Sequence, residues 1–321
     1  MLKINDMWKN FFDYVNEQDN HILKNLNPVK GKEIYVMKLC GNIMNNFINS
    51  FDDNDTVYID SQNHFFFVLI PNTSKILITL FCCGLNLESI YSKFDNYGLA
   101  IEGCFNIEPI TMVPFFYRGY EYDTKKFLTI NNNNIIKKQG FMVVDNHHII
   151  KIMDGLELES YVPNGINVQY IEGMLLYHHG EPFIKLDKMK DVIVDNKIID
   201  GSNVTIDYNN FKINVNNKEY HFSDLGKNID MVNNELFDVN NGLLVLAIDH
   251  NDNIFITYHR KIDFYNIMLF LKFFNCKDAI LLCNSLEANI IWKEADNNIY
   301  NKTDFIGNPN KFVSNIIAFS G

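Results

Sequence analysis

Two pairs of adjacent histidines, His147-His148 and His178-His179, are the side chains best suited to metal chemistry. Each pair falls in a predicted strand, where consecutive side chains point to opposite faces, so the two rings cannot reach one ion unless the backbone turns. The sequence has no His-x-His or His-x-x-x-His spacing, which would place two rings on one side of a strand or helix. We therefore expect no metal site, and nothing in the sequence indicates a cofactor.

Six cysteines, at positions 40, 82, 83, 104, 276 and 283, offer a second kind of chemistry. A nucleophilic thiol needs a nearby base, and His259 or His250 could activate Cys104 or Cys283. The six positions include no Cys-x-x-Cys pair, and most of them lie in apolar runs. We expect buried thiols that act as small core residues.

The first segments of the chain have apolar residues at helical spacing. Trp8, Phe11 and Phe12 start an apolar stripe, and a second stripe predicts a helix from about Glu33 to Phe51. We interpret residues 1–55 as an N-terminal helical extension that covers the core or docks a partner. Residues 56–321 form the predicted main domain.

From residue 56 onward, short β-rich runs alternate with turns rich in Asn, Asp and Ser. Predicted strands include His64–Ile70, Leu243–Asp249 and Ile254–Tyr258, and Asp263 can cap a helix over Phe264–Phe274. The pattern predicts an α+β fold with a mixed β-sheet core.

Composition limits the classes of partner. The chain has 321 residues, of which 47% are hydrophobic, and its formal charge is 28 − 39 = −11. This negative charge argues against binding nucleic acid, which needs a basic surface. The N-terminus has no apolar signal segment, and runs such as Phe65–Pro71 are far shorter than the roughly 20 residues of a membrane span. We expect a protein made in the cytoplasm and not inserted into a membrane.

A bias toward Asn, Ile, Phe, Lys and Tyr, with only 7 Pro and 2 Trp, is typical of AT-rich genomes. Phages, large DNA viruses and some bacteria share this bias. It permits a viral origin, and with it a place in the virion.

Five segments, in chain order, carry a resemblance to one family: Ser89–Asn106, Tyr170–Gly180, Leu243–Asp249, Ala279–Glu287 and Phe312–Ile317. Ser89–Asn106 is similar to a segment that ends in Ala-Ile-Asn-Gly-Gly-Phe-Phe, and Tyr170–Gly180 is similar to a strand and turn with the pattern Ser-Gly-Pro-x-Leu-Ile-x-x-Gly. Leu243–Asp249 is similar to a strand that begins with Arg-Thr-Ala. Ala279–Glu287 is similar to a strand that ends in Asp-Gly-Gly-Gly-Ser, and Phe312–Ile317 is similar to a closing strand with Arg-Pro-Val-Ser-Asn. This order resembles the phosphodiester glycosidase family, which is related to the enzyme that uncovers mannose 6-phosphate. The resemblance spans about residues 88–319 and implies that family's fold.

The resemblance also implies a ligand-binding cleft, whose lining residues here would be Gly103, Cys104, Arg260, Cys283, Asn284, Ser285 and Asn315. Most of the family's polar positions are changed. Glu102 stands in place of an Asn, Leu243 in place of an Arg suited to holding phosphate, and Cys283 in place of the Asp. The residues Asn284-Ser285-Leu286 replace glycines that would let a substrate approach the backbone. We therefore expect the family's activity to be absent.

Within this implied cleft, Glu102 and Glu287 support an enzymatic alternative, in which two carboxylates serve as acid and base of a glycosidase. Solvated loop glutamates are the simpler interpretation. Three hypotheses follow. The first is a non-catalytic structural or binding protein in a phage tail or virion, with other protein subunits as partners. The second is an active glycoside or phosphodiester hydrolase, and the third is a glycan-binding module.

Overall fold

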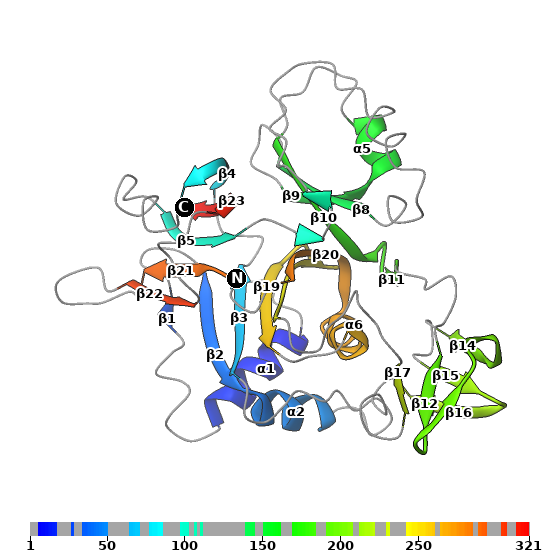
Figure 1. Cartoon of the computed structure of the whole chain (residues 1–321). Helices are drawn as coiled ribbons and strands as arrows, with labels where there is room; N and C mark the ends of the chain where they lie inside the picture. Colours follow the sequence, from blue (N-terminus) through cyan, green and yellow to red (C-terminus); the bar gives the residue numbers. More distant parts are fainter. Residues whose placement is uncertain are drawn as a thin grey trace.

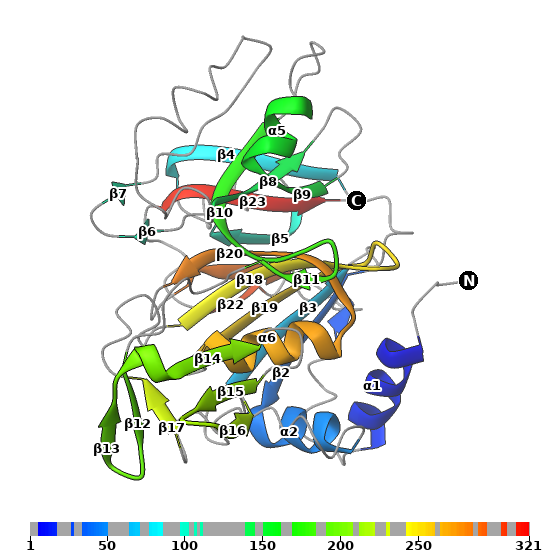
Figure 2. The ribbon, with the colours of Figure 1, turned by 90° about the vertical axis from the view of Figure 1, so that its right-hand side faces the viewer.

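A computed structural model describes residues 6–17, 27–28, 34–50, 64–70, 77–85, 97–102, 106–107, 110–111, 139–144, 150–161, 169–183, 191–207, 212–221, 229–231, 242–260, 264–284, 288–293, 303–306 and 313–320. The elements form three layers: a five-stranded sheet, a ten-stranded sheet in the middle, and a layer of helices with small sheets (Figures 1 and 2). No helix in the described part of the chain is both long and apolar enough to cross a membrane.

The ten-stranded sheet is the centre of the molecule. In spatial order its strands are β1 (Asn27–Pro28), β2 (Tyr35–Cys40), β3 (His64–Ile70), β19 (Ile254–Arg260), β18 (Gly242–Asp249), β20 (Cys276–Asn284), β10 (Gln169–His178), β8 (Gln139–Val144) and β9 (Ile150–Asp154), and β11 (Glu181–Pro182) pairs with β10. Side chains alternate between its faces, and both faces are buried: Val245 packs on the helix side, and Leu246 packs on the five-stranded sheet. Burial on both faces explains why β18 reads as a continuous apolar run.

The five-stranded sheet covers one face of the ten-stranded sheet. In spatial order it contains β22 (Thr303–Ile306), β21 (Ile290–Lys293), β5 (Tyr97–Glu102), β23 (Val313–Ser320) and β4 (Leu77–Leu85). Leu99, Ile290 and Phe319 pack from this sheet against the central strands. A two-stranded pair, β6 (Asn106–Ile107) and β7 (Ile110–Thr111), follows β5 in the chain.

The opposite face is covered by helices and two small sheets. The helices are α1 (Asp6–Glu17), α2 (Gly41–Asn49) and α6 (Phe264–Phe273), and a short helix, α5 (Gly155–Tyr161), lies beside β8 and β9. The small sheets contain β12 (Val192–Val194), β13 (Lys197–Ile199) and β17 (Ile229–Met231), and β14 (Val204–Asp207), β15 (Lys212–Val215) and β16 (Lys218–His221), with the 3-10 turn η4 (Gly201–Asn203) before β14. Their buried side chains join the same core as the helices.

Two expectations about fold class are corrected. The described residues are predominantly β rather than α+β, and every strand pairing among them is antiparallel, so the predicted mixed sheet is wrong for this part of the chain. The predicted strands His64–Ile70, Leu243–Asp249 and Ile254–Tyr258 are confirmed within one or two residues. The helix predicted over Phe264–Phe274 is also confirmed, whereas its proposed cap, Asp263, lies outside the described residues.

The helix predicted from Glu33 to Phe51 is wrong in its first part. Residues Tyr35–Cys40 form β2, and the helix begins only at Gly41. The pairing of β2 with β3 decides the conformation, because this segment completes a buried sheet. The proposed boundary between residues 55 and 56 lies outside the described residues, and the strands that flank it, β2 and β3, are neighbours in one sheet.

A close approach between strands shapes the edge of the central sheet. Gly173 of β10 pairs with Gly140 of β8. A Cβ atom at Gly173 would lie 2.6 Å from the carbonyl oxygen of Leu281 in β20, and one at Gly140 would lie 2.8 Å from Cβ of Leu175. The two glycines therefore let β8, β10 and β20 come closer than side chains would permit. The β10–β20 register shifts just beyond this point, between Leu175 and Tyr177.

Candidate functional site

The cleft residues predicted in the central sheet lie at the ends of adjacent strands. Arg260 ends β19 and pairs with Gly242, while Asn284 ends β20 and pairs with Leu243. Cys283 pairs with Leu244. The backbone thus brings Arg260, Cys283 and Asn284 to one end of three neighbouring strands, although their side chains are outside the described part of the structure.

Two other predicted cleft residues lie in the five-stranded sheet. Glu102 ends β5 and pairs with Ile316 of β23, which places it next to Asn315 along that strand. The side chains of Glu102 and Asn315 are not described, and Gly103, Cys104, Ser285 and Glu287 lie outside the described residues altogether. The expected carboxylate pair Glu102/Glu287 and the thiol pair Cys104/Cys283 therefore stay predictions.

The described side chains at this end of the central sheet are buried and mainly apolar. Leu243 and Leu244 are 2% and 0% exposed and contact opposite cores. His259, the partner of Leu243 across the strands, is fully buried, its ring lies edge-on to Phe270, and its Nε2 is 3.0 Å from the Thr257 hydroxyl. Burial holds the pKa of His259 well below its ordinary value, so the ring is neutral.

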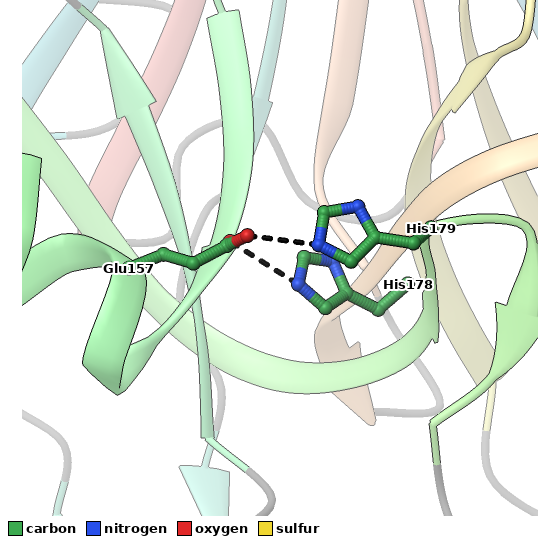
Figure 3. A group of neighbouring side chains, drawn as sticks. All are labelled: Glu157, His178 and His179. Carbon is green, nitrogen blue, oxygen red and sulfur yellow. Dashed lines mark hydrogen bonds and ion pairs between the residues drawn. The ribbon is translucent and has the colours of Figure 1, made fainter.

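The clearest group of convergent polar side chains lies elsewhere, at the far end of β10. It consists of Glu157, His178, His179 and Asp278, which we call the histidine cluster (Figure 3 shows the first three). Nε2 of His178 is 3.1 Å from Oε2 of Glu157, and Nε2 of His179 is 2.9 Å from Oε1 of the same carboxylate. One carboxylate therefore faces two imidazole rings.

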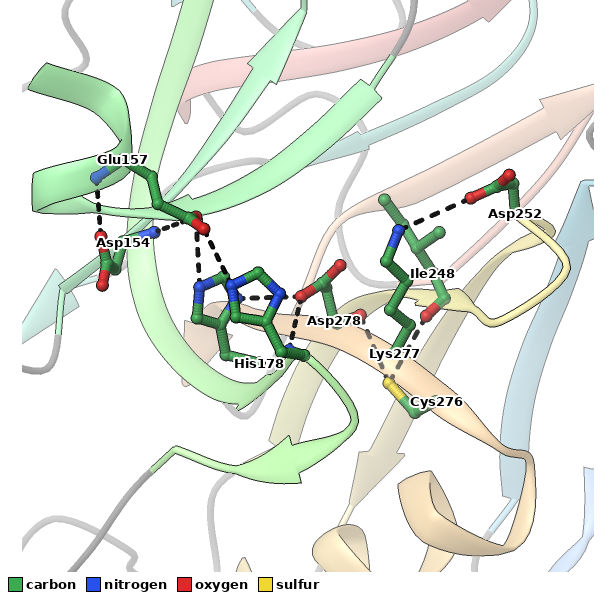
Figure 4. Close-up of polar contacts among 9 residues, drawn as sticks. Asp154, Glu157, His178, Ile248, Asp252, Cys276, Lys277 and Asp278 are labelled. Carbon is green, nitrogen blue, oxygen red and sulfur yellow. Dashed lines mark hydrogen bonds and ion pairs between the residues drawn. The ribbon is translucent and has the colours of Figure 1, made fainter. Parts of the chain in front are cut away.

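Glu157 is positioned by the start of α5. The backbone N–H of Glu157 donates to the Asp154 side chain at 2.8 Å, and the backbone N–H of Asp154 donates to the Glu157 carboxylate at 3.3 Å. This reciprocal pair is a capping box, which the spacing Asp154-x-x-Glu157 encodes. The cap holds the Glu157 carboxylate at the junction of β9 and α5, facing the end of β10 (Figure 4).

His178 is positioned by the pairing of β10 with β20. Tyr177 lies opposite Ala279, so the next residue of β10 comes beside Asp278. Nδ1 of His178 is 2.9 Å from Oδ1 of Asp278, and the backbone N–H of His179 donates to the same oxygen at 3.0 Å. Both His178 and Asp278 are more than nine-tenths buried, at 8% and 6% exposure.

A turn brings the two rings together. His179 adopts a positive φ of 53° and Gly180 one of 83°, so β10 ends at His178 and the chain reverses into β11. The ring centroids of His178 and His179 are 3.8 Å apart with an interplanar angle of 30°. The prediction that adjacent histidines point to opposite faces is therefore wrong for this pair, because a turn replaces the strand at His179. His147 and His148 lie outside the described residues.

The charges in the cluster shift two pKa values. Burial lowers the pKa of His178, but the hydrogen bond with Asp278 and the negative charges of Glu157, Asp278 and Asp154 outweigh burial and raise it above the ordinary value. For Asp278, burial acts to raise the pKa, and the bonds from His178 and the His179 N–H lower it overall. Ionised Asp278 can only accept a hydrogen bond, so Nδ1 of His178 is the donor.

Next to the cluster, β20 carries groups without an evident chemical role. The Cys276 thiol is buried and lies 3.3 Å from the Asp278 carbonyl oxygen; its pKa is raised well above the ordinary value, by burial first and then by the charges of Asp278 and Asp249 (Figure 4). Lys277 pairs loosely with Asp252 at 3.8 Å. A protonated, buried thiol is a poor nucleophile, so Cys276 agrees with the expectation that the cysteines act as small core residues.

Glu157 and Asp278 were not among the functional residues predicted from the sequence. The signals for Glu157 were present: an Asp-x-x-Glu capping box directly after a strand, and a glycine after the second histidine pair that permits a turn. Asp278 has no comparable signal, because only the register of β10 on β20 places it beside His178.

Comparison with known proteins gives distant structural similarities only. No family model matches the chain, and no curated protein matches it in sequence. Among solved structures, the chain is similar to the zebrafish N-acetylglucosamine-1-phosphodiester alpha-N-acetylglucosaminidase catalytic domain auto-inhibited by its pro-peptide, with 11% identity, a TM-score of 0.44, and coverage of 92% of this chain and 84% of that one.

Two further structures are less similar. A hypothetical protein from Synechocystis has 10% identity and a TM-score of 0.34, covering 82% of this chain and 60% of that one. A putative exported protein from Burkholderia pseudomallei has 6% identity and a TM-score of 0.37, covering 81% of this chain and 75% of that one. The relation to the phosphodiester glycosidase fold is thus a distant one, and it assigns no activity to this chain.

Proposed function

We propose that this chain is a non-catalytic structural or binding protein built on a phosphodiester-glycosidase-like fold. The observation that carries the proposal is the buried, apolar character of Leu243 and Leu244 at the strand ends where the sequence resemblance implies a cleft. Leu243 stands where the family has an Arg, and the neighbouring His259 is held neutral. These described side chains offer no cation to hold a sugar phosphate.

The partners in this proposal are other protein subunits of an assembly. The composition, typical of AT-rich genomes, permits a phage or viral particle as the setting, with the chain made in the cytoplasm and built into the virion. A phage tail or virion component needs packing surfaces rather than an active site. The alternative non-catalytic role is that of a glycan-binding module.

The test combines turnover with oligomeric state. The purified full chain is incubated with a panel of sugar phosphodiesters and glycans, and its mass in solution is measured by light scattering over a range of concentrations. We expect no turnover of any substrate and a concentration-dependent, self-associating species. The Glu102→Gln variant is the matched control for the hydrolase alternative.

Two outcomes would overturn the proposal. Turnover by the wild type that Glu102→Gln abolishes would establish a hydrolase with rearranged carboxylates. A strictly monomeric protein with saturable binding of one glycan would replace the structural role by a glycan-binding role.

A further inference from the structure

A ring nitrogen at the centre of the histidine cluster, Nε2 of His178, has no hydrogen bond among the described residues. His178 is 8% exposed, and Oε2 of Glu157 lies only 3.1 Å from this nitrogen. A buried ring nitrogen without a hydrogen bond is costly unless something binds it. The ligand atoms of Glu157, His178 and His179 all lie within 4.8 Å of one another.

We propose that Glu157, His178 and His179 bind one divalent transition-metal ion, with zinc as the preferred ion. Two imidazole nitrogens and one carboxylate are a donor set that suits zinc and its neighbours in the first transition row, whereas magnesium and calcium prefer oxygen ligands alone. Three protein ligands leave one coordination position of a tetrahedral ion for water. This site is separate from the strand ends on which the proposed function rests.

The distances already approach those of a metal site. Zinc binds imidazole nitrogen and carboxylate oxygen at about 2.0–2.1 Å, so ligand atoms in a tetrahedral site lie roughly 3.3 Å apart. The contacts from Glu157 to His178 and His179 measure 3.1 and 2.9 Å. An outward shift of a few tenths of an ångström would bring these two contacts to that separation, and the exposed ring of His179 and the half-buried Glu157 side chain have room for it.

The residues around the ligands orient them as metal sites require. Asp278 accepts the Nδ1 proton of His178, which directs the lone pair of Nε2 in the neutral ring toward Glu157. A carboxylate behind a ligating histidine in this way fixes the tautomer and the ring orientation. The capping box with Asp154 holds Glu157 in the same manner. The site is therefore pre-organised without the ion.

The test uses the full chain stripped of metal with a chelator. Zn²⁺ binding is measured by calorimetry, and Co²⁺ serves as a spectroscopic probe, because a four-coordinate cobalt site absorbs visible light strongly. The variants are His179→Ala, whose ring is exposed so that the fold tolerates its loss, and Glu157→Gln. His221→Ala in the separate β14–β16 sheet is the matched control.

We expect one equivalent of Zn²⁺ per chain, a visible Co²⁺ spectrum, and no competition from excess Mg²⁺ or Ca²⁺. His179→Ala and Glu157→Gln should each weaken Zn²⁺ binding at least about 10-fold, since even a residue that only orients a ligand is worth roughly 10–100-fold in affinity. His221→Ala should bind like the wild type. Failure of the wild type to bind Zn²⁺ or Co²⁺, or equal binding by all four proteins, would overturn the proposal.

Discussion

At the scale of single residues, two buried histidines show how surroundings set protonation in opposite directions. His259 has a Thr257 hydroxyl and the Phe270 ring beside it, so burial dominates and its pKa falls. His178 is also buried, but Asp278 and Glu157 face it, and their effect raises its pKa. The imidazole ring of His259 is therefore neutral, whereas the surroundings of His178 favour the protonated, positively charged ring.

The lowered pKa of His259 predicts acid sensitivity. Between its folded pKa and the ordinary value of 6.5, only the unfolded chain binds a proton at this ring, so the free energy of unfolding falls as the pH drops below 6.5. The slope contributed is at most about 1.4 kcal/mol per pH unit. Above 6.5 the ring contributes no pH dependence.

This prediction is checked by urea unfolding of the wild type and His259→Gln between about pH 5 and 8. The variant lowers stability at every pH because it alters a packed site, but it cannot titrate. The difference in unfolding free energy between the two proteins should therefore shrink as the pH falls below 6.5. A difference that stays constant with pH would contradict the assignment of a neutral His259.

At the scale of elements, β10 connects the packing of the sheet to the histidine cluster. Its Gly173 lets it approach β20, and five residues later His178 meets Asp278. A residue with a side chain at position 173 would collide with a backbone oxygen, which cannot move aside as a flexible side chain can. The geometry of the cluster therefore depends on a glycine that takes no part in it.

Gly173→Ala should destabilise the protein by roughly 1–3 kcal/mol, the range found for overpacked cores. The new Cβ would lie 2.6 Å from the Leu281 carbonyl oxygen, so β10 must shift away from β20. Chemical denaturation measures the stability loss, and Zn²⁺ affinity reports the displacement of His178 from Asp278.

Gly155→Ala is the control for this change, because Gly155 is half-buried at the start of α5 and has no positive φ. Alanine at this position should leave the free energy of unfolding within about 1 kcal/mol of the wild-type value, since alanine has a higher helix propensity than glycine. Equal losses from the two variants would mean that the close approach at Gly173 is not limiting.

At the scale of the whole molecule, the N-terminal helix is part of the core. Trp8 of α1 stacks on Phe274 with ring centroids 4.4 Å apart, and it also contacts Phe67 and Phe255 of the central sheet. Its Nε1 donates to the buried carboxylate of Asp249 at 2.8 Å. That carboxylate also accepts from Asn253, so α1 is bonded to the turn between β18 and β19.

Removal of residues 1–17 should therefore unfold or aggregate the protein. The truncation uncovers Phe67, Phe255 and Phe274 and takes one donor from Asp249, and loss of a single buried aromatic side chain already costs about 3–5 kcal/mol. Two such side chains, Trp8 and Phe11, are lost from a domain whose total stability is typically about 5–15 kcal/mol.

Soluble yield, circular dichroism and binding of a hydrophobic dye measure this outcome. A chain that lacks only residues 1–5 keeps all of α1 (Asp6–Glu17) and is the control for the truncation. A truncated protein with native spectra and unchanged stability would show that the segment is a detachable extension.

Strands with strong local patterns could be predicted from the sequence. His64–Ile70 and Leu243–Asp249 are apolar, β-rich runs bounded by turns, and local pattern is enough to identify such segments. The family resemblance also placed Cys283 and Asn284 at the end of a strand, where β20 ends. Local pattern failed for Tyr35–Cys40, whose apolar residues fit a helix as well as a strand, because only pairing with β3 distinguishes the two.

The contacts within the histidine cluster depend on how the chain folds and could not be predicted from the sequence. Glu157, His178 and Asp278 lie up to 121 positions apart in sequence (278 − 157), and their contact requires the register of β10 on β20 together with the packing of α5 beside β9. The turn at His179 reverses the rule that adjacent strand residues face opposite ways. Strand register and chain reversal are non-local, so no spacing rule within a single segment could have placed these residues together.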